Sequence, residues 1–429
     1  MNDCPLILKT DISPETISHD LGLNRKLVYQ ELKAVEKDVQ LIIEKVMNEG
    51  DQAVKELTEC YDLCRLTQFQ VFPEEIERAW KQAGTDFQQI VMKIVERVRD
   101  FHQNQLEKSW WFNRGHSQFG EMVLPLTSVA AYILGGRASY PSSVIMTVIP
   151  AQIAGVSNIV LLTPPNAQGK VSPDVLAVAH YLGIENVIRI GGAQAIAAVA
   201  FGTESIPQVD KVVGPGNIYV TVAKKLLCGL IGIDSLAGPS EVLIIADESC
   251  QPEWVAIDLL AQAEHDPLAR SILLSPSASV LMETKKNINL LYPKNPFPFS
   301  KKVPISLYQV ENLTTAFEIS NTVAPEHIQI CCKDSLRLLS MVQHAGAIFL
   351  GNWAPVALGD YGFGPNHVLP TLSGSRFSSP LSVRDFLKKS SYIFPQEGDP
   401  TLNYQDFANL AVREGLYYHQ KSLLARMSE

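Results

Sequence analysis

From Gly120 onward, short runs rich in β-branched residues alternate with segments long enough to form a helix. The first set of runs covers 129–134, 158–162, 186–190, 211–213 and 230–233, and the second covers 241–246, 271–274, 327–331 and 347–350. Strands and helices that alternate at this spacing are typical of βαβ units, in which successive strands run parallel. The sequence therefore predicts an α/β protein with two similar layers, each built on a mostly parallel sheet.

Helical periodicity dominates on either side of this region. Between residues 27 and 112 the apolar positions predict one helix that ends at Gly50, one that begins at Pro73 and a long third helix through 87–98. Residues 402–426 also have a helical pattern, whereas residues 1–24 show no sustained periodicity. We therefore expect an N-terminal arm, a helical N-terminal region and a helical C-terminal arm.

Composition narrows the class of partner. The chain has 429 residues, of which 46% are hydrophobic and 19% charged, so it is long enough for two or three globular domains. A formal net charge of -9 without a Lys/Arg run argues against nucleic acid and favours a small polar ligand. The most apolar window, 144–162, is interrupted by Pro150 and Gly155, which predicts helix, turn and strand and no membrane span.

The seven cysteines indicate a reducing compartment. Their number is odd and no C-x-x-C pair occurs, so most thiols are expected to be small core side chains. Cys60 and Cys64 share a helix face, which permits a metal pair but is explained more simply by packing. Cys331 and Cys332 are expected at the end of a buried strand. Because the first residues lack the basic and apolar regions of a signal peptide, we expect a cytoplasmic protein.

Two glycine-containing turns each follow a predicted strand and precede a helix. They lie at 134–143, with Gly135 and Gly136, and at 214–217, with the sequence Gly-Pro-Gly-Asn. Free backbone N–H groups at a helix start attract phosphate, so either turn can hold a nucleotide, although tight turns alone also explain these glycines. Neither is a G-x-G-x-x-G, so the two predicted sheets are Rossmann-like but lack the usual dinucleotide fingerprint.

A helix that begins near Pro252 ends with a pair of polar side chains. Gln262 and His265 stand three positions apart, so an amide oxygen and an imidazole nitrogen can reach the same ion. This spacing occurs by chance in many surface helices and does not establish a metal site by itself. The apolar face of the same helix is expected to carry Trp254, Ile257 and Leu260.

Glu326 and His327 place a carboxylate beside an imidazole just before a predicted strand. An imidazole whose pKa lies near neutrality can take a proton from an alcohol, and an adjacent carboxylate can activate water. The alternative is structural, with Glu326 capping a neighbour and His327 satisfied in the core. For the pair considered in isolation, this structural interpretation is the simpler one.

Further candidate ligands lie closer to the C-terminus. Asp360 stands in a glycine-rich stretch with the less favoured His367, while Glu414 and His419 either serve a site or belong to an ordinary solvated helix face. A mixed set of nitrogen and oxygen donors suits zinc or manganese better than a thiolate structural site. Such a set beside a carboxylate and an imidazole also suits a zinc hydrolase. A nucleotide-binding protein without catalysis is a further alternative. The four candidates for this set are Gln262, His265, Asp360 and His419.

The sequence resembles the histidinol dehydrogenase family over nearly the whole chain from about residue 25. So many separate motifs in one order are not expected by chance. They lie at 132 with 135–136, 140–143, 191–195, 214–217, 237–241, 262–266, 324–327, 359–361, 364–370 and 414–416 with 419.

The resemblance implies an α/β enzyme that oxidises L-histidinol through an enzyme-held L-histidinaldehyde to L-histidine, with two NAD used in succession. His327 would be the base of the alcohol step, and Glu326 would activate the water that hydrates the aldehyde. One zinc ion per subunit would hold the substrate, bound by Gln262, His265, Asp360 and His419. The substrate would contact Ser240, Gln262, His265, His327, Asp360, Glu414 and His419, and NAD would lie along Tyr132, Gln194 and Asn217.

The resemblance also implies a homodimer and a domain order. The C-terminal arm, 382–429, would cross to the partner so that Glu414 and His419 complete the other subunit's site. The remaining parts would be an arm over 1–24, a main α/β domain over 25–129 and 238–381 with the zinc and substrate site, and an inserted NAD domain over 130–237.

Three positions depart from the family's pattern. Leu134 stands where a proline usually precedes the two glycines, Thr147 where asparagine is common and Gln152 where lysine is common. All three lie near the proposed nucleotide turn, so they bear on NAD binding and leave the zinc set intact. The family also has relatives that oxidise other small alcohols, so a paralogue of this kind is the main alternative within the family.

Overall fold

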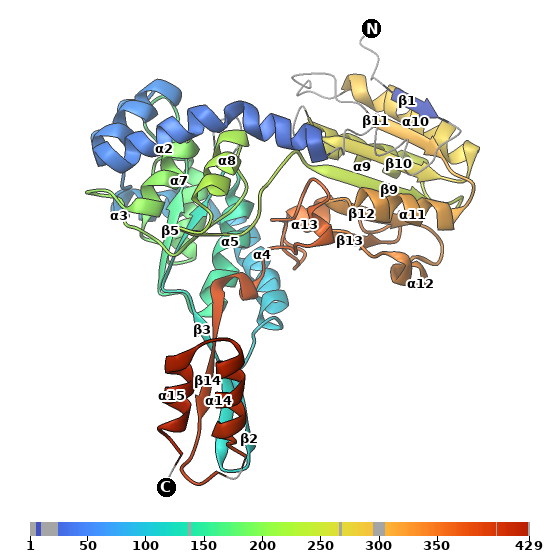
Figure 1. Ribbon diagram of the computed structural model, residues 1–429. Helices are drawn as coiled ribbons and strands as arrows, with labels where there is room; N and C mark the ends of the chain where they lie inside the picture. Colours follow the sequence, from blue (N-terminus) through green and yellow to red (C-terminus); the bar gives the residue numbers. More distant parts are fainter. Residues whose placement is uncertain are drawn as a thin grey trace. The chain divides into compact units, whose positions relative to one another are not determined.

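The computed structural model describes residues 6–9, 25–135, 139–265, 268–294, 305–399 and 401–427. The chain forms two compact units. The larger consists of Met1–Gln105 and Leu126–Phe386, and the smaller of Leu106–Pro125 and Leu387–Glu429. Figure 1 labels the helices and strands of both.

The first sheet of the larger unit has five parallel strands in the order β6-β5-β4-β7-β8. The chain starts in the centre at β4, moves outward through β5 to β6, and returns to β7 on the other side of β4. Ligands of such doubly wound sheets bind outside the carboxyl ends of the strands at this switch point. The strands are β4 (Ser128–Tyr132), β5 (Asn158–Leu162), β6 (Val187–Ile188), β7 (Lys211–Val213) and β8 (Gly232–Ile233), and the helices are α5 (Pro141–Ala154), α6 (Pro173–Tyr181), α7 (Gly192–Phe201) and α8 (Ile218–Leu227).

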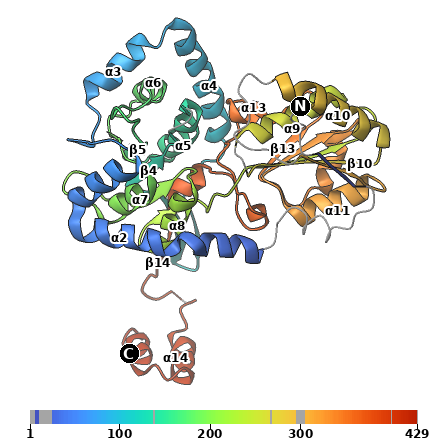
Figure 2. The same ribbon diagram turned by 90° about the horizontal axis from the view of Figure 1, so that it is seen from above.

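The second sheet repeats this winding with six parallel strands in the order β1-β11-β10-β9-β12-β13. Val242 and Ile244 of the central strand face a core shared with α9 and α10, whereas Leu243 and Ile245 face a core shared with α11. Figure 2 shows these helices on opposite faces of the sheet. The strands are β1 (Leu6–Lys9), β9 (Glu241–Ala246), β10 (Arg270–Ser275), β11 (Ile305–Gln309), β12 (His327–Cys331) and β13 (Ala347–Leu350), and the main helices are α9 (Pro252–His265), α10 (Ala278–Leu291) and α11 (Leu313–Val323).

The two predicted α/β layers are confirmed. Strands predicted at 158–162, 211–213, 241–246, 327–331 and 347–350 have those limits in the structure. The prediction omits β1 and β11, which are four and five residues long.

The N-terminal helices follow the predicted pattern. α2 (Arg25–Tyr61) bends at Gly50, which has φ 54 and ψ -131, and α3 (Pro73–Gln82) and α4 (Thr85–Gln103) come next. Buried side chains of α2, such as Val39 and Val46, share one core with α7 and α8 of the first sheet. The domain limits expected at 25–129 and 238–381 stay a prediction.

The smaller unit contains an antiparallel sheet that the sequence analysis does not predict. Its order is β14-β3-β2, formed by β14 (Leu387–Phe394), β3 (Ser117–Pro125) and β2 (Trp110–Arg114). Helices are expected as far as residue 112, but the last of them, α4, ends at Gln103, and residues 110–114 form the strand β2. The single helix expected over 402–426 is also wrong, because Gly415 has φ 72 and separates α14 (Tyr404–Arg413) from α15 (Tyr417–Leu424).

Two smaller expectations are confirmed within the described residues. The apolar window 144–162 forms the rest of α5, a turn at Gly155 with φ 92, and β5. In the described part of the chain, no helix is both long and apolar enough to span a bilayer. Cys331 ends β12 and is buried together with Cys332.

Candidate active site

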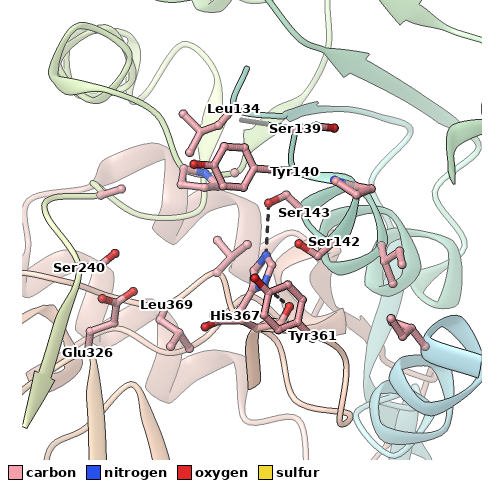
Figure 3. Close-up of a pocket in the computed structure, with 18 of the residues that line it drawn as sticks. Leu134, Ser139, Tyr140, Ser142, Ser143, Ser240, Glu326, Tyr361, His367 and Leu369 are labelled. Carbon is pink, nitrogen blue, oxygen red and sulfur yellow. Dashed lines mark hydrogen bonds between the residues drawn. The ribbon is translucent and has the colours of Figure 1, made fainter. Parts of the chain in front are cut away.

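A cavity of about 500 Å³ lies in the larger unit, lined by segments of both sheets and by α4. Figure 3 shows side chains that project into it from the β4–α5 connection, from the start of β12 and from the 361–369 stretch. Residues predicted for the site from four separate segments meet here. They are Ser240, Gln262, Glu326, His327 and Asp360.

The two sheets reach the cavity from opposite strand ends. In the first sheet Leu134 and Gly214 follow β4 and β7, so the carboxyl edge faces the cavity. In the second sheet β9 begins at Glu241 and β12 begins at His327, and these neighbouring strands pair with His327 opposite Val242. Parallel pairing therefore brings the starts of both strands together at the amino edge of the second sheet.

Glu326 is a buried carboxyl group held by the strand beside it. Its side chain is 7% exposed, and its Oε2 accepts a hydrogen bond of 2.9 Å from the Glu241 N–H. Burial raises the pKa of Glu326 well above its usual range, and the charges of Glu241 and Asp360 raise it further. Hydrogen bonds from the Glu241 N–H and from Ser240, whose hydroxyl points toward the carboxyl group in Figure 3, oppose this shift. A group of this kind can take a proton at a pH where an ordinary carboxylate is a poor base.

His327 is oriented by the same strand. Its Nδ1 lies 3.0 Å from the Glu241 carbonyl oxygen and 3.6 Å from Glu326 Oε2. Because a carbonyl oxygen can only accept, the short contact places the proton on Nδ1, and in the neutral ring the basic lone pair is on Nε2. His327 thereby has the tautomer that a general base needs.

The candidate metal ligands lie partly within this cavity. Gln262 is 4% exposed and lines it together with Asp360. His265 is the last residue of α9, but its side chain lies outside the described residues, and His419 is exposed on α15 of the smaller unit. The described residues contain no group of three or more His, Cys, Asp or Glu side chains placed to hold a metal ion. An amide oxygen and a carboxylate in one cavity fit half of a mixed N/O zinc site.

The apolar face expected for α9 is wrong for two of its three residues. Trp254 and Ile257 are 39% and 46% exposed, whereas Leu260 packs partly buried against the core of the second sheet, in which Val255, Ala256 and Leu259 are buried. Trp254 instead packs edge-on against Trp353 with ring centroids 5.1 Å apart. A helical period of 3.6 residues fits the stripe with Trp254 and Ile257 as well as the stripe with Val255 and Leu259. Only the position of the sheet decides which of the two is buried.

His367, the less favoured ligand candidate, links two parts of the cavity wall. Its Nε2 lies 3.3 Å from the Ser143 hydroxyl at the start of α5, and its Nδ1 lies 3.1 Å from the Asp360 carbonyl oxygen (Figure 3). The ring therefore holds the Asp360 turn toward the first sheet. Both ring nitrogens of His367 are thus engaged in contacts that hold the cavity wall in place.

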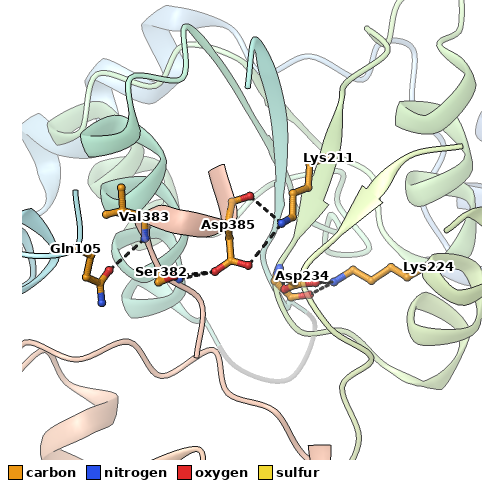
Figure 4. Close-up of polar contacts among 8 residues, drawn as sticks. Gln105, Lys211, Lys224, Asp234, Ser382, Val383 and Asp385 are labelled. Atoms are coloured by element: carbon orange, nitrogen blue, oxygen red, sulfur yellow. Dashed lines mark hydrogen bonds and ion pairs between the residues drawn. The ribbon is translucent and has the colours of Figure 1, made fainter. Parts of the chain in front are cut away.

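The turn at 214–217 is held by a buried ion pair that the sequence analysis does not identify. Lys224 Nζ lies 2.8 Å from Asp234 Oδ1, and their side chains are 2% and 6% exposed. Lys224 Nζ also donates to the Gly214 carbonyl at 2.5 Å, and Asp234 Oδ2 accepts from the Gly214 N–H at 2.7 Å (Figure 4). Both backbone groups of Gly214 are thus fixed at the switch point of the first sheet.

The three residues expected along NAD lie at the carboxyl ends of strands in this sheet. The Tyr132 hydroxyl accepts a hydrogen bond of 3.0 Å from the Gly192 N–H, and burial raises the Tyr132 pKa to about 12. Gln194 is 1% exposed in the first turn of α7. The Asn217 side chain caps α8 by accepting from two backbone N–H groups. None of the three is among the described residues that line the 500 Å³ cavity.

Substituting Gly214 tests how tightly this turn is packed. Gly214 has φ 106, and a Cβ there would lie 2.2 Å from the Tyr132 carbonyl oxygen. We expect Gly214→Ala to lower the free energy of unfolding by about 1–3 kcal/mol more than Gly229→Ala does. Gly229 is a matched control because it has φ 104 and open space around its Cβ position. Urea unfolding of both variants measures the difference, and equal effects would contradict the close packing.

The three departures from the family's pattern have separate environments. Leu134 lines the cavity. The Thr147 hydroxyl donates to the Ser143 carbonyl at 2.7 Å, and Gln152 donates to the Leu182 carbonyl at 2.6 Å. Leu134 is therefore the departure with direct access to a bound molecule.

Two doubly wound parallel sheets, with a cavity between their strand ends that Glu326, His327 and Asp360 help to line, define an α/β protein with two Rossmann-like layers. A family model described as histidinol dehydrogenase matches residues 26–427. The chain belongs to the histidinol dehydrogenase family.

Individual relatives match nearly the whole chain. A histidinol dehydrogenase from Halalkalibacterium halodurans is 42% identical over 396 residues, which cover 91% of this chain and 93% of the relative. One from Bacillus subtilis is 44% identical over 395 residues, covering 91% and 92%. The crystal structure of histidinol dehydrogenase from Elizabethkingia anophelis is 30% identical, has a TM-score of 0.89 and covers 99% of each chain.

Proposed function

We propose that this chain catalyses the NAD-dependent oxidation of L-histidinol through L-histidinaldehyde to L-histidine, the last steps of histidine biosynthesis, in the cytoplasm. The observation that carries the proposal is the meeting of Ser240, Glu326 and His327 with Gln262 and Asp360 in one cavity. Membership of the histidinol dehydrogenase family supports the substrate. A paralogue for another small alcohol and a zinc hydrolase remain the alternatives.

His327 and Glu326 have different tasks in the proposed reaction. His327 takes the alcohol proton on Nε2 while its Nδ1 keeps the hydrogen bond to the Glu241 carbonyl. Glu326 takes a proton from the water that adds to the aldehyde, because its raised pKa makes it a stronger base than an exposed carboxylate. Ser240 and Glu241 hold the Glu326 carboxyl group in place for this step.

The proposed cofactors are two NAD used in succession and one zinc ion per subunit. When bound, zinc supplies a positive anchor for the substrate's nitrogen atoms, and NAD accepts hydride. Gln262, His265, Asp360 and His419 would hold the metal, and Tyr132, Gln194 and Asn217 would lie along NAD. A substrate fixed at two nitrogens keeps the reactive aldehyde in the cavity between the two oxidations.

A homodimer is part of the proposal. Glu414 and His419 are exposed on the smaller unit, where they are available to another chain. We propose that they complete the partner's substrate and zinc site, so that each site combines the cavity of one chain with the C-terminal arm of the other. A monomeric species would then be inactive.

The stoichiometry of NADH tests the reaction. Purified zinc-loaded protein with excess NAD should form two NADH for each L-histidinol consumed, measured by absorbance and by quantifying L-histidine. One NADH with released aldehyde would contradict the double oxidation. No NADH would favour another alcohol as substrate, or a hydrolase if esters or amides are cleaved without NAD.

Glu326→Gln should separate the two half-reactions. We expect oxidation of supplied L-histidinaldehyde to fall about 100-fold or more and oxidation of L-histidinol to the aldehyde to fall much less, because only the oxidation of the aldehyde needs Glu326 as a base. In the wild type, aldehyde oxidation should be lost as pH falls through the raised pKa of Glu326, since protonation removes the base. Glu318→Gln, on the exposed face of α11, is the control. Equal losses in both half-reactions would remove the water-activating role.

A further inference from the structure

We propose that the Glu241 side chain is a positioning residue for both half-reactions, because it anchors the segment that fixes the backbone around Glu326 and His327. The inference rests on the proposed function, since it assigns a role within the same site. Glu241 is fully buried at the start of β9 and does not line the cavity as described. Its influence on the reaction must therefore pass through its neighbours.

The backbone of Glu241 contacts both residues proposed for proton transfer. Its N–H donates to Glu326 Oε2 at 2.9 Å, and its carbonyl oxygen lies 3.0 Å from His327 Nδ1. One residue therefore orients the carboxylate and selects the tautomer of the imidazole. A small shift of this backbone changes both contacts at once, and proton transfer depends steeply on such geometry.

The side chain of Glu241 holds a strained turn. Its Oε1 accepts a hydrogen bond of 2.7 Å from the Leu372 N–H. Leu372 and Ser373 have φ 54 and 60, a left-handed conformation that residues with a Cβ adopt in succession only when their surroundings impose it. The carboxylate is one of the groups that impose it here.

This turn begins a clamp segment, residues 371–376, that contacts the chain on both sides of the site. The Thr371 hydroxyl accepts from the Gly238 N–H at 2.6 Å, just before β9. The Ser375 hydroxyl donates to the Ala324 carbonyl at 2.9 Å, just before Glu326. The clamp segment thus connects the two loops that lead into β9 and β12, and the Glu241 side chain anchors it through the hydrogen bond from Leu372.

The charge of Glu241 has a second effect. Burial raises its pKa to about 6, while the nearby Arg270 guanidinium lowers it. Its Oε2 has no hydrogen-bond partner among the described residues. Asp360 is the other carboxylate that raises the pKa of Glu326, and Ser240 opposes it. Removing the Glu241 charge should therefore lower the pKa of Glu326.

Glu241→Ala removes both the anchor and the charge. We expect kcat of both half-reactions to fall about 10–100-fold, the range for partners that orient functional side chains. KM for L-histidinol, the dissociation constant of NAD and the bound zinc should change less than about threefold, since the residues proposed to bind them are intact. Steady-state kinetics, NAD titration by protein fluorescence and metal analysis give these values.

Glu241→Gln keeps an oxygen that can accept from the Leu372 N–H but carries no charge. We expect most of the kcat lost in Glu241→Ala to be restored. The acid limb of the aldehyde half-reaction should move to lower pH, because Glu326 then remains deprotonated further into acid. A residue that only supports the fold would restore activity without moving this limb.

Asp210→Ala is the matched control, because the Asp210 carboxylate also accepts from backbone N–H groups, those of Thr127 and Ser128, at the edge of the first sheet. It should leave kcat and the pH profile unchanged. If Glu241→Ala does not fold, Ser375→Ala loosens the same clamp segment and should lower kcat in both half-reactions. Wild-type kcat in folded Glu241→Ala, or an unmoved acid limb in Glu241→Gln, would overturn the inference. A wild-type protein inactive toward L-histidinol would instead refute the proposed function.

Discussion

Replacing His327 with Asn is expected to lower turnover of L-histidinol by about 100-fold or more, the range for loss of a general base. The asparagine amide can still donate toward the Glu241 carbonyl in place of Nδ1–H, so the surrounding backbone should be preserved. It has no basic nitrogen where Nε2 stood. The loss should therefore appear in kcat, while bound zinc and NAD affinity stay close to the wild-type values.

Rates of NADH formation, metal analysis and NAD titration measure the three quantities on one preparation. His116→Asn is the control, since this histidine is exposed in the turn between β2 and β3. It should behave as the wild type. Near-normal turnover of His327→Asn would show that another group takes the alcohol proton.

Mixed dimers of two inactive variants should regain activity. If each site combines the cavity of one chain with His419 of the other, a dimer of one His327→Asn chain and one His419→Asn chain contains one intact and one doubly altered site. Such dimers, purified through a different tag on each chain, should have about half of the wild-type activity. Each variant alone should be inactive, because every site of the homodimer carries the substitution.

The same experiment discriminates against a site built within one chain. In that case both sites of the mixed dimer would carry one substitution, and the activity would stay at the background of the two variants. Mixing His327→Asn with Glu326→Gln is the control, because both residues line the cavity of their own chain and every site of such a dimer carries one substitution. Formation of L-histidine above the background of the two variants in this control would point to contaminating wild-type enzyme.

The order of elements follows from local sequence. Buried parallel strands are short apolar runs, and their limits at 241–246 and 327–331 are visible without any tertiary information. Pro73 and Gly50 mark helix boundaries through their own backbone preferences. The break at Gly415 was available from the same reasoning, but the flanking helical pattern obscured it.

Residues far apart in sequence meet for reasons that local patterns do not contain. Gln262, Glu326 and Asp360 share a cavity because parallel pairing aligns the starts of β9 and β12 and the neighbouring loops close over them. The family's motifs point to these residues as site residues, whereas periodicity alone does not separate them from ordinary surface or core residues. Their exposure and hydrogen bonds, and the raised pKa of Glu326, depend on that packing.

The sequence by itself determined the fold class, most strands and the family, because these depend on local apolar patterns and on motifs in a fixed order. Only the tertiary structure decided which face of α9 is buried, how the Lys224–Asp234 pair holds Gly214, and that Glu241 contacts Glu326, His327 and Leu372. Each of these is a contact between separate elements of the chain. Its energy depends on burial and on the geometry of the partner, which no single segment encodes.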